Sequence, residues 1–274
     1  MLEVETEASF GNKTPTTIAK REEQMKIQVL FALLSSALAS VLSGAGICTA
    51  YAQGGQVREI GLPATGGSSD TSVNASTQVQ LPIRITEPGN YRLNTNLVGA
   101  LMPVIRIESS AVTLDLNGFS VTGLENVIVA NGSNVAILNG TVSNLDDQAI
   151  SISGSNCRVE GLRTSGGADG ISLSGPNCIV KNNTVQAAHT GILCSGCVVS
   201  GNTVSTLSDV AIGATNSSLV VGNTATSTAS VALHADDTTG YAQNVLHGGP
   251  LTADVTGGVQ IGQNLCVTSK ICPP

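Results

Sequence analysis

One column of aliphatic residues constrains the fold of this chain more than any other feature. The column consists of Ile105, Ile128, Ile150, Ile171, Ile192 and Ile212, and Val231 closes it. Its members are spaced 19 to 23 residues apart, and a second small or apolar residue follows each member two positions later. Apolar residues that alternate with a period of two are typical of a strand with one buried face. Each repeat therefore begins with a strand.

Two more strands complete each repeat. The second begins at Val112, Val135, Cys157, Cys178, Cys197 and Ser218, and the third buries Val142, Val185, Val204 and Ala225. One coil cannot bury its own apolar side, whereas coils stacked about 4.8 Å apart share a continuous core. The 3.6-residue period of a helical solenoid and the spacing of a leucine-rich repeat are both missing. The sequence predicts an all-β fold, a right-handed parallel β-helix of about seven coils with three short strands per coil.

An asparagine follows the second strand in several repeats, at Asn183, Asn202 and Asn223. Asparagine tolerates the left-handed backbone conformation of sharp turns, and its side-chain amide can bond to the amide of a neighbouring coil. We expect these residues to lie in turns and to stack from coil to coil.

Three stretches carry a resemblance to a known group of proteins. They are Ile85-Thr86-Glu87-Pro88-Gly89-Asn90-Tyr91-Arg92-Leu93, Val112-Thr113-Leu114-Asp115-Leu116-Asn117-Gly118-Phe119, and Asp169-Gly170-Ile171-Ser172-Leu173 followed by Asn182-Asn183-Thr184. From Leu81 onward the chain resembles secreted bacterial right-handed parallel β-helix repeat proteins of the pectate lyase-like superfamily. The resemblance implies the fold more than a function, because the superfamily includes lyases, hydrolases, epimerases, tailspikes and proteins without an assigned activity.

The N-terminal part of the chain has the pattern of a secretion signal. Lys26 precedes a run from Ile27 to Ala52 that has no charged residue, and Ala50-Tyr51-Ala52 gives the small-x-small pattern for cleavage before Gln53. A retained transmembrane anchor is the alternative, because the run is long enough to span a bilayer. The pattern predicts a secreted or periplasmic protein that starts at Met25 and has no membrane segment after cleavage.

The composition divides the chain into three parts. Residues 1–52 are the N-terminal extension and signal peptide, 53–80 form a Gly- and Ser-rich linker, and 81–274 form the β-helix domain. We expect Leu81–Leu97 to cap the first coil and Asp236–Pro274 to cap the last, because an open end of a β-helix exposes core and strand edges.

Six cysteines follow the signal segment, as is common for an oxidising compartment. Cys266 and Cys272 are predicted to form a disulfide. The pairing of the other four, Cys157, Cys178, Cys194 and Cys197, stays open. Cys157 and Cys178 occupy one column and either bridge two coils or fill the core as small apolar residues. A redox or zinc role for Cys194 and Cys197 is disfavoured, because both point inward across a tight turn.

Charge and aromatic content restrict the partners. After residue 52 the chain has 8 basic and 14 acidic residues, a net charge of −6. No basic stripe is present, so nucleic acid is not an expected partner. The aromatic residues after the signal are Tyr91, Phe119 and Tyr241, which offer few platforms for stacked sugar rings.

Polar residues that precede the first strand of successive coils form the candidate catalytic site: Asp147, Asp169, His189 and Asp209. Stacked carboxylates beside an imidazole can bind a cation or act as acid and base. The alternative is that aspartate simply favours turns. The outward positions of the first strands, Arg106, Val129, Ser151, Ser172, Leu193, Gly213 and Ala232, include one charge, which argues against lyase chemistry. No cofactor or metal is expected.

An apolar stripe points outward on the second strands, at Ile179, Val198 and Leu219. We expect the C-terminal segment to cover it, or else a second subunit in a homo-oligomer. Two function classes follow. The first is a non-catalytic protein that binds a glycan, such as a polysaccharide, or another cell-envelope component. The second is a carbohydrate-active enzyme, a lyase, hydrolase or epimerase, that acts on an acidic polysaccharide.

Overall fold

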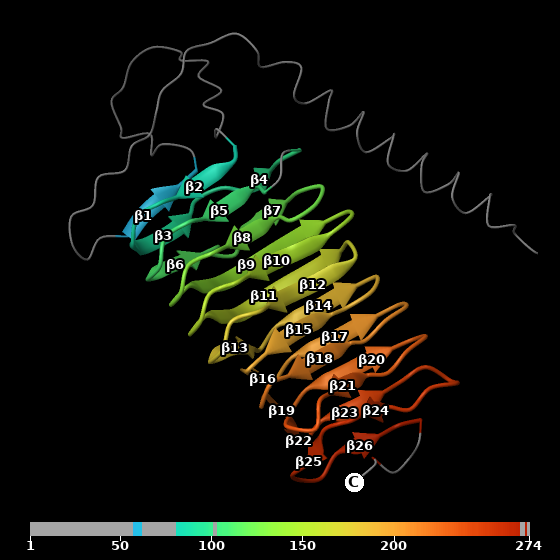
Figure 1. Cartoon of the computed structure of the whole chain (residues 1–274). Helices are drawn as coiled ribbons and strands as arrows, with labels where there is room; N and C mark the ends of the chain where they lie inside the picture. The colour runs from blue at the N-terminus through green and yellow to red at the C-terminus, as the bar shows by residue number, and fades with distance from the viewer. Residues whose placement is uncertain (1–56, 62–80, 101–102, 269–271, 273–274) are drawn as a thin grey trace, which may run out of the picture. The chain divides into compact units, whose positions relative to one another are not determined.

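The computed structural model describes residues 57–61, 81–100, 103–268 and 272, all within one compact unit that spans Ala50–Pro274. Strands and turns make up this part of the chain (Figure 1). None of the described residues belongs to a helix that is long and apolar enough to cross a membrane. The predicted signal segment, residues 1–52, lies outside the described residues.

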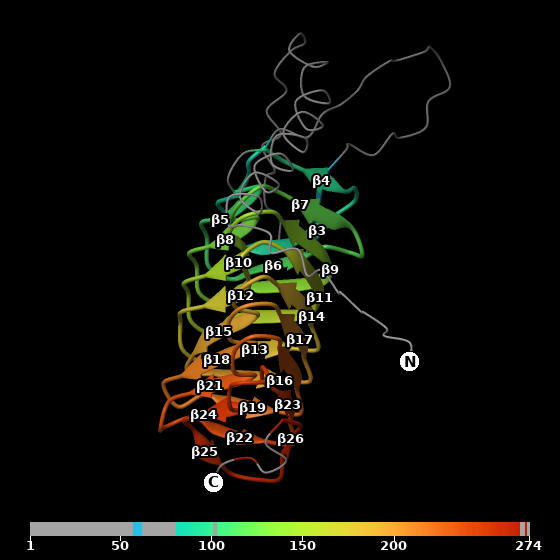
Figure 2. The same cartoon turned by 90° about the vertical axis from the view of Figure 1, so that its right-hand side faces the viewer.

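The first face is a parallel sheet of nine strands, one from each coil. Figure 2 shows most of these strands one below another along one side. They are β2 (Ile83–Ile85), β5 (Ile105–Ile107), β8 (Ile128–Ala130), β10 (Gln148–Ile152), β12 (Asp169–Leu173), β15 (Ile192–Ser195), β18 (Ile212–Thr215), β21 (Leu233–Ala235) and β24 (Val255–Thr256).

The other two faces belong to a second, 17-stranded sheet. The second face contains β1 (Val57–Ile60), β3 (Gly89–Leu93), β6 (Val112–Asp115), β13 (Cys178–Lys181), β16 (Cys197–Ser200), β19 (Leu219–Val221), β22 (Gly240–Ala242) and β25 (Val259–Gln260). The third contains β4 (Leu97–Val98), β7 (Ser120–Thr122), β14 (Thr184–Ala187), β17 (Thr203–Thr206), β20 (Thr224–Ser227), β23 (Val245–His247) and β26 (Leu265–Cys266). Two long strands, β9 (Ala136–Asn144) and β11 (Arg158–Gly166), bend across both faces.

The predicted fold, a right-handed parallel β-helix, is therefore confirmed. The isoleucine column pairs in register from Ile105↔Ile128 to Ile192↔Ile212, and its members are at most 1% exposed. Stacked valine and isoleucine columns on the other two faces are buried as well. A single apolar core thus runs through the coils, as the alternating pattern requires.

The β-helix has nine coils rather than the predicted seven. The segment Leu81–Leu97, expected as a cap, contributes a regular coil with β2, β3 and β4. Residues after Asp236 were also expected to leave the repeat, but β22 to β26 continue all three faces. The predicted linker is likewise not a linker throughout, because β1 pairs with β3.

The last predicted member of the isoleucine column is wrong. Ile212 pairs with Leu233, not with Val231. The outward residue of that strand is therefore His234, whereas Ala232, predicted to point outward, is fully buried.

The predicted asparagine stack is confirmed and is longer than expected. It consists of Asn183, Asn202, Asn223, Asn244 and Asn264, in which each side-chain amide nitrogen donates to the side-chain oxygen of the next member at 3.0 Å. The left-handed backbone conformation occurs at the residue before each stacked asparagine, as at Asn182 (φ 56°), Gly201 (φ 65°) and Gly222 (φ 66°). The preceding residue makes the turn. The side chain of the asparagine satisfies backbone groups of the equivalent turn one coil earlier.

Candidate functional site

The predicted polar corner lies where the third face turns into the nine-stranded sheet. Asp169 begins β12, Asp147 precedes β10, and His189 and Asp209 are exposed in the turns before β15 and β18. Three of the four residues thus occupy the turns before the first strands of successive coils, as the sequence predicted, and Asp169 lies one position further on, at the start of β12, where it pairs with Gln148.

The carboxylates of this corner bond to the turns around them. Asp147 Oδ2 accepts from Asn126 Nδ2 at 2.6 Å, and Asp169 Oδ1 accepts from the Thr190 backbone N–H at 3.1 Å. At Asp209 the main-chain carbonyl accepts, from the hydroxyls of Thr206 and Ser227. Within the described ranges, no group of three or more His, Cys, Asp or Glu side chains is arranged to hold a metal ion. These contacts suit aspartates that stabilise turns, and a catalytic role stays a prediction.

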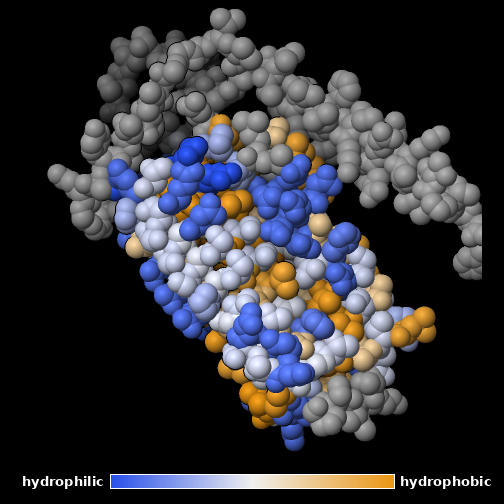
Figure 3. Space-filling view, in the orientation of Figure 1, coloured by the Kyte–Doolittle hydropathy of each residue, from blue (hydrophilic) through white to orange (hydrophobic). Residues whose placement is uncertain are grey.

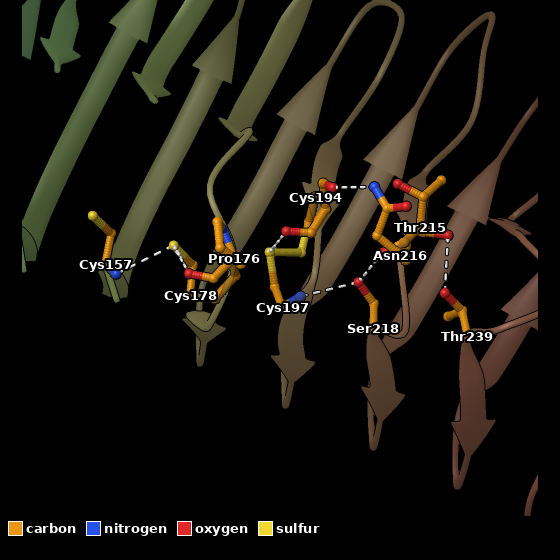
Figure 4. Close-up of a disulfide and its surroundings, with 12 residues drawn as sticks. Cys157, Pro176, Cys178, Cys194, Cys197, Thr215, Asn216, Ser218 and Thr239 are labelled. Atoms are coloured by element: carbon orange, nitrogen blue, oxygen red, sulfur yellow. Dashed lines mark hydrogen bonds between the residues drawn. A yellow bond between two sulfur atoms is a disulfide. The ribbon is translucent and has the colours of Figure 1, made fainter. Parts of the chain in front are cut away.

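A column of cysteines lies at a different corner, where the nine-stranded sheet turns into the second face. Cys157, Cys178 and Cys197 take the first inward position of the second face in three successive coils, and each is at most 3% exposed (Figure 4). Ser218 and then Thr239 follow them in the next two coils. The sulfur atoms therefore line one edge of the core, with polar hydroxyls after them.

The structure assigns the pairing that the sequence left open. Cys194 and Cys197 form a disulfide with a Cα separation of 6.1 Å, and Cys157 and Cys178 are free thiols. The corner is shortened here, because only Gly196 (φ 66°) separates β15 from β16. This brings the last inward residue of one strand next to the first inward residue of the other. The predicted Cys266–Cys272 disulfide is present, with a Cα separation of 5.2 Å.

The two free thiols contact each other and the turn of the coil that carries Cys157. The Cys157 backbone N–H donates to Cys178 Sγ at 3.2 Å. The Cys157 thiol donates to the Ser155 carbonyl at 3.3 Å, and the Cys178 thiol donates to the Gly154 carbonyl at 3.4 Å. The thiols thus bridge neighbouring coils without a covalent bond.

Each thiol changes the acidity of the other. A hydrogen bond from Cys178 lowers the pKa of the Cys157 thiol to about 7, although burial acts in the opposite direction. The same hydrogen bond, together with burial, raises the pKa of Cys178 far above its usual value. The pair therefore loses its first proton easily and holds its second tightly. Such a thiol–thiolate pair can bind a soft cation or attack a disulfide.

His234, and not the predicted Ala232, is the outward residue of β21. It stands in the outward column of the nine-stranded sheet between Gly213 and Thr256, and its Nδ1 lies 2.8 Å from Thr256 Oγ1. Its outward position could not be predicted, because the sequence pattern aligned Ile212 with Val231 and not with Leu233. The same column contains the small residues Ser151, Ser172 and Gly213 and, between the last two, the exposed Leu193.

The described residues of the C-terminal segment do not cover the apolar stripe on the second face. Ile179 and Val198 are 39% and 36% exposed, and Leu219 pairs with Gly240, which pairs with Val259. The C-terminal segment thus lengthens this stripe, which contradicts the prediction that it folds back as a cover. On the face shown in Figure 3, by contrast, hydrophobic surface is divided into small patches between polar residues.

Comparison with protein families gives one match, over residues 105–265, to the family described as periplasmic copper-binding protein (NosD). The matched segment runs from β5 to β26 and covers more than half of the chain. No curated protein matches the chain. Because the family is periplasmic, the predicted secreted or periplasmic location is confirmed. The β-helix described above is therefore that of a member of the NosD family of periplasmic copper-binding proteins.

Proposed function

We propose that this chain is a non-catalytic periplasmic protein that binds copper(I) between the thiols of Cys157 and Cys178. The observation that carries the proposal is the pair itself, two buried thiols outside any disulfide on neighbouring coils. The family description names copper as the bound metal.

The donor atoms decide which oxidation state of copper suits the site. Copper(II) prefers several nitrogen and oxygen ligands, and no cluster of three such side chains occurs in the described ranges. Copper(I) is soft and is selected by thiolates, and two of them suffice to hold it. Cys157 and Cys178 therefore fit copper(I). From the sequence alone no cofactor was expected, and this proposal replaces that expectation.

The environment of the thiols favours a bound cation. The lowered pKa of Cys157 supplies one thiolate near neutral pH. A cation that replaces the proton between the two sulfur atoms takes the place of the hydrogen bond that, together with burial, raises the pKa of Cys178. Burial keeps water and competing oxygen ligands away from both sulfur atoms.

The experiment is an anaerobic titration of the mature protein with copper(I), in competition with a chromophoric copper(I) chelator and with ascorbate as the reductant. We expect about one ion per chain, with only sulfur ligands in the X-ray absorption spectrum. Cys157→Ser and Cys178→Ser should each abolish this binding, whereas His234→Ala should leave it unchanged. Binding that survives in the Cys157→Ser/Cys178→Ser double variant would overturn the proposal.

We further propose that the outer face of the nine-stranded sheet binds a glycan or another envelope component. Support comes from its outward column, in which the small residues Ser151, Ser172 and Gly213 lie on either side of the exposed Leu193 and offer a rigid, partly apolar surface to a ligand. The resemblance to the pectate lyase-like superfamily agrees with such a ligand. Ser172→Arg should weaken retention on immobilised envelope polysaccharide, whereas Thr184→Arg, exposed on another face, should not. Equal retention of both variants would contradict this second proposal.

The enzymatic alternative is tested by the same ligands. Mass spectrometry of pectate, alginate and glycosaminoglycans after incubation with the protein, with and without calcium, should show no unsaturated or hydrolysed products. Products that disappear in His189→Ala would instead assign the corner of Asp147, Asp169, His189 and Asp209 to catalysis.

A further inference from the structure

Cys178 stands between a free thiol and a disulfide. Cys157 precedes it in the column, and Cys197, its Cα partner in β16, follows it. Neighbouring strands of a sheet lie about 4.8 Å apart, which is within the Cα range of about 4.4–6.8 Å that a disulfide accepts. Each neighbouring pair in the column is therefore close enough to be bonded, but Cys197 is bonded instead to Cys194 of its own coil.

We infer that these four cysteines form a thiol–disulfide exchange site, in which the disulfide moves along the column from coil to coil. In the first step, Cys178 loses its proton and its sulfur attacks Cys197 Sγ. A Cys178–Cys197 disulfide forms, the Cys194–Cys197 bond breaks, and Cys194 leaves as a thiolate that takes up the proton. In the second step, Cys157 attacks Cys178 in the same way, and Cys197 leaves. No electrons enter or leave the chain.

The contacts at the corner favour the first step. Figure 4 shows Cys178 in the same column as Cys197, on the neighbouring strand. Cys178 lies one strand from Cys197, whereas Cys157 lies two strands away, so Cys178 is the thiol that can reach the disulfide. The shortened turn at Gly196 holds the leaving sulfur of Cys194 against the corner.

Exchange gives two end states at the same oxidation level. One has the Cys194–Cys197 disulfide with free Cys157 and Cys178, and the other has a Cys157–Cys178 disulfide with free Cys194 and Cys197. As a regulation of the copper site, this inference rests on the proposed function, because only the first state presents the thiols of Cys157 and Cys178. Copper(I) would then shift the population toward that state.

The test needs no metal. The folded mature protein is incubated with a chelator at several pH values above neutrality, quenched with acid, alkylated under denaturing conditions and mapped by mass spectrometry. In the Cys157→Ser variant, one of these four positions carries a free thiol at a time. The alkyl label that marks it should be found on Cys178 at first and increasingly on Cys194 with time, and faster at higher pH. In Cys178→Ser, Cys157 is two strands, about 9.6 Å, from Cys197, so the label should stay on Cys157.

The two variants make the outcomes decisive. Label confined to Cys178 in Cys157→Ser would overturn the inference, as would label on Cys194 or Cys197 in Cys178→Ser. A rate that rises with protein concentration would also overturn it, because exchange would then be between molecules. An intact Cys266–Cys272 disulfide and an unchanged circular dichroism spectrum show that each variant is folded. Failure of copper binding leaves these results untouched, so the two proposals fail separately.

Discussion

The side-chain amide of Asn202 donates from Nδ2 to Oδ1 of Asn223 at 3.0 Å, and the backbone N–H of Asn202 donates to the same oxygen at 2.9 Å. Asn223 is 1% exposed, so neither donor has water as a substitute. The nitrogen of Asn223 in turn donates to the Val199 carbonyl at 2.9 Å and to Asn244 at 3.0 Å. One side chain thus satisfies backbone groups of the turn in the preceding coil and connects three coils.

Replacing Asn223 with alanine should destabilise the β-helix strongly. Two buried donors on Asn202 and one carbonyl, that of Val199, would lose a partner, and each buried unsatisfied group costs about 1–3 kcal/mol. We expect the free energy of unfolding to fall by about 3 kcal/mol or more in urea denaturation.

Asn131→Ala is the matched control for this substitution. Asn131 is exposed and accepts one hydrogen bond, from the Ser153 hydroxyl at 3.3 Å. Its loss should cost less than about 0.5 kcal/mol, as is usual for surface positions. Equal losses for the two variants would show that the buried asparagine stack contributes no special stability.

Asp236 should make the folding stability of the protein depend on pH in the acidic range. Its carboxylate accepts from the Asn216 backbone N–H at 2.6 Å and from the hydroxyls of Thr238 and Thr239 at 2.8 Å, and these bonds lower its pKa from 3.8 to about 2. A pKa that is lower in the folded state gives stability that is complete above about pH 4 and is lost as pH falls through 2. The difference in melting temperature between the protein and Asp236→Asn should therefore shrink from pH 5 to pH 2. Asp237→Asn makes the same change in net charge beside it and should not reproduce this pH dependence.

The hydrogen bond that Asp169 accepts allows a test of whether this residue stabilises a turn or binds a cation. Its Oδ1 accepts from the Thr190 backbone N–H, so Asp169→Ala should lower the free energy of unfolding by about 1 kcal/mol. If the residue serves only the turn, the loss is the same with and without calcium in thermal unfolding. Stabilisation by calcium that is present in the protein and missing in the variant would favour the enzymatic alternative instead.

Sequence periodicity predicted the interior of the β-helix well, because coil length and alternation together determine which residue stacks on which. The Ile-Arg-Ile motif of β5 already occurs one coil earlier, at Ile83-Arg84-Ile85, so the additional N-terminal coil had a signal in the sequence. The error at Val231 has a physical cause. A shift of two residues keeps the same face inward, and Val231 and Leu233 both suit the core.

The cysteine pairing could not be predicted in the same way. Cys178 has a cysteine one coil away on either side, and the stacking distance allows a bond to each. The single-residue corner at Gly196 decides the pairing, since it brings Cys194 to Cys197 within one coil. For the polar corner, the sequence placed Asp147, His189 and Asp209 correctly in turns and Asp169 one residue away, at the start of β12, but it could not show which turn groups the aspartates bond.

The uncovered stripe of Ile179, Val198 and Leu219 predicts self-association of the protein. Burial of such side chains between two copies is favourable by about 25 cal/mol per Å², and none of the described residues of the C-terminal segment covers them. Val198→Ser should weaken association about tenfold in sedimentation equilibrium, equivalent to about 1.4 kcal/mol. Leu207→Ser is the control, because Leu207 is 62% exposed but lies outside the stripe. A protein that stays monomeric at all concentrations, or equal effects of the two variants, would leave the stripe without a role in a homo-oligomer.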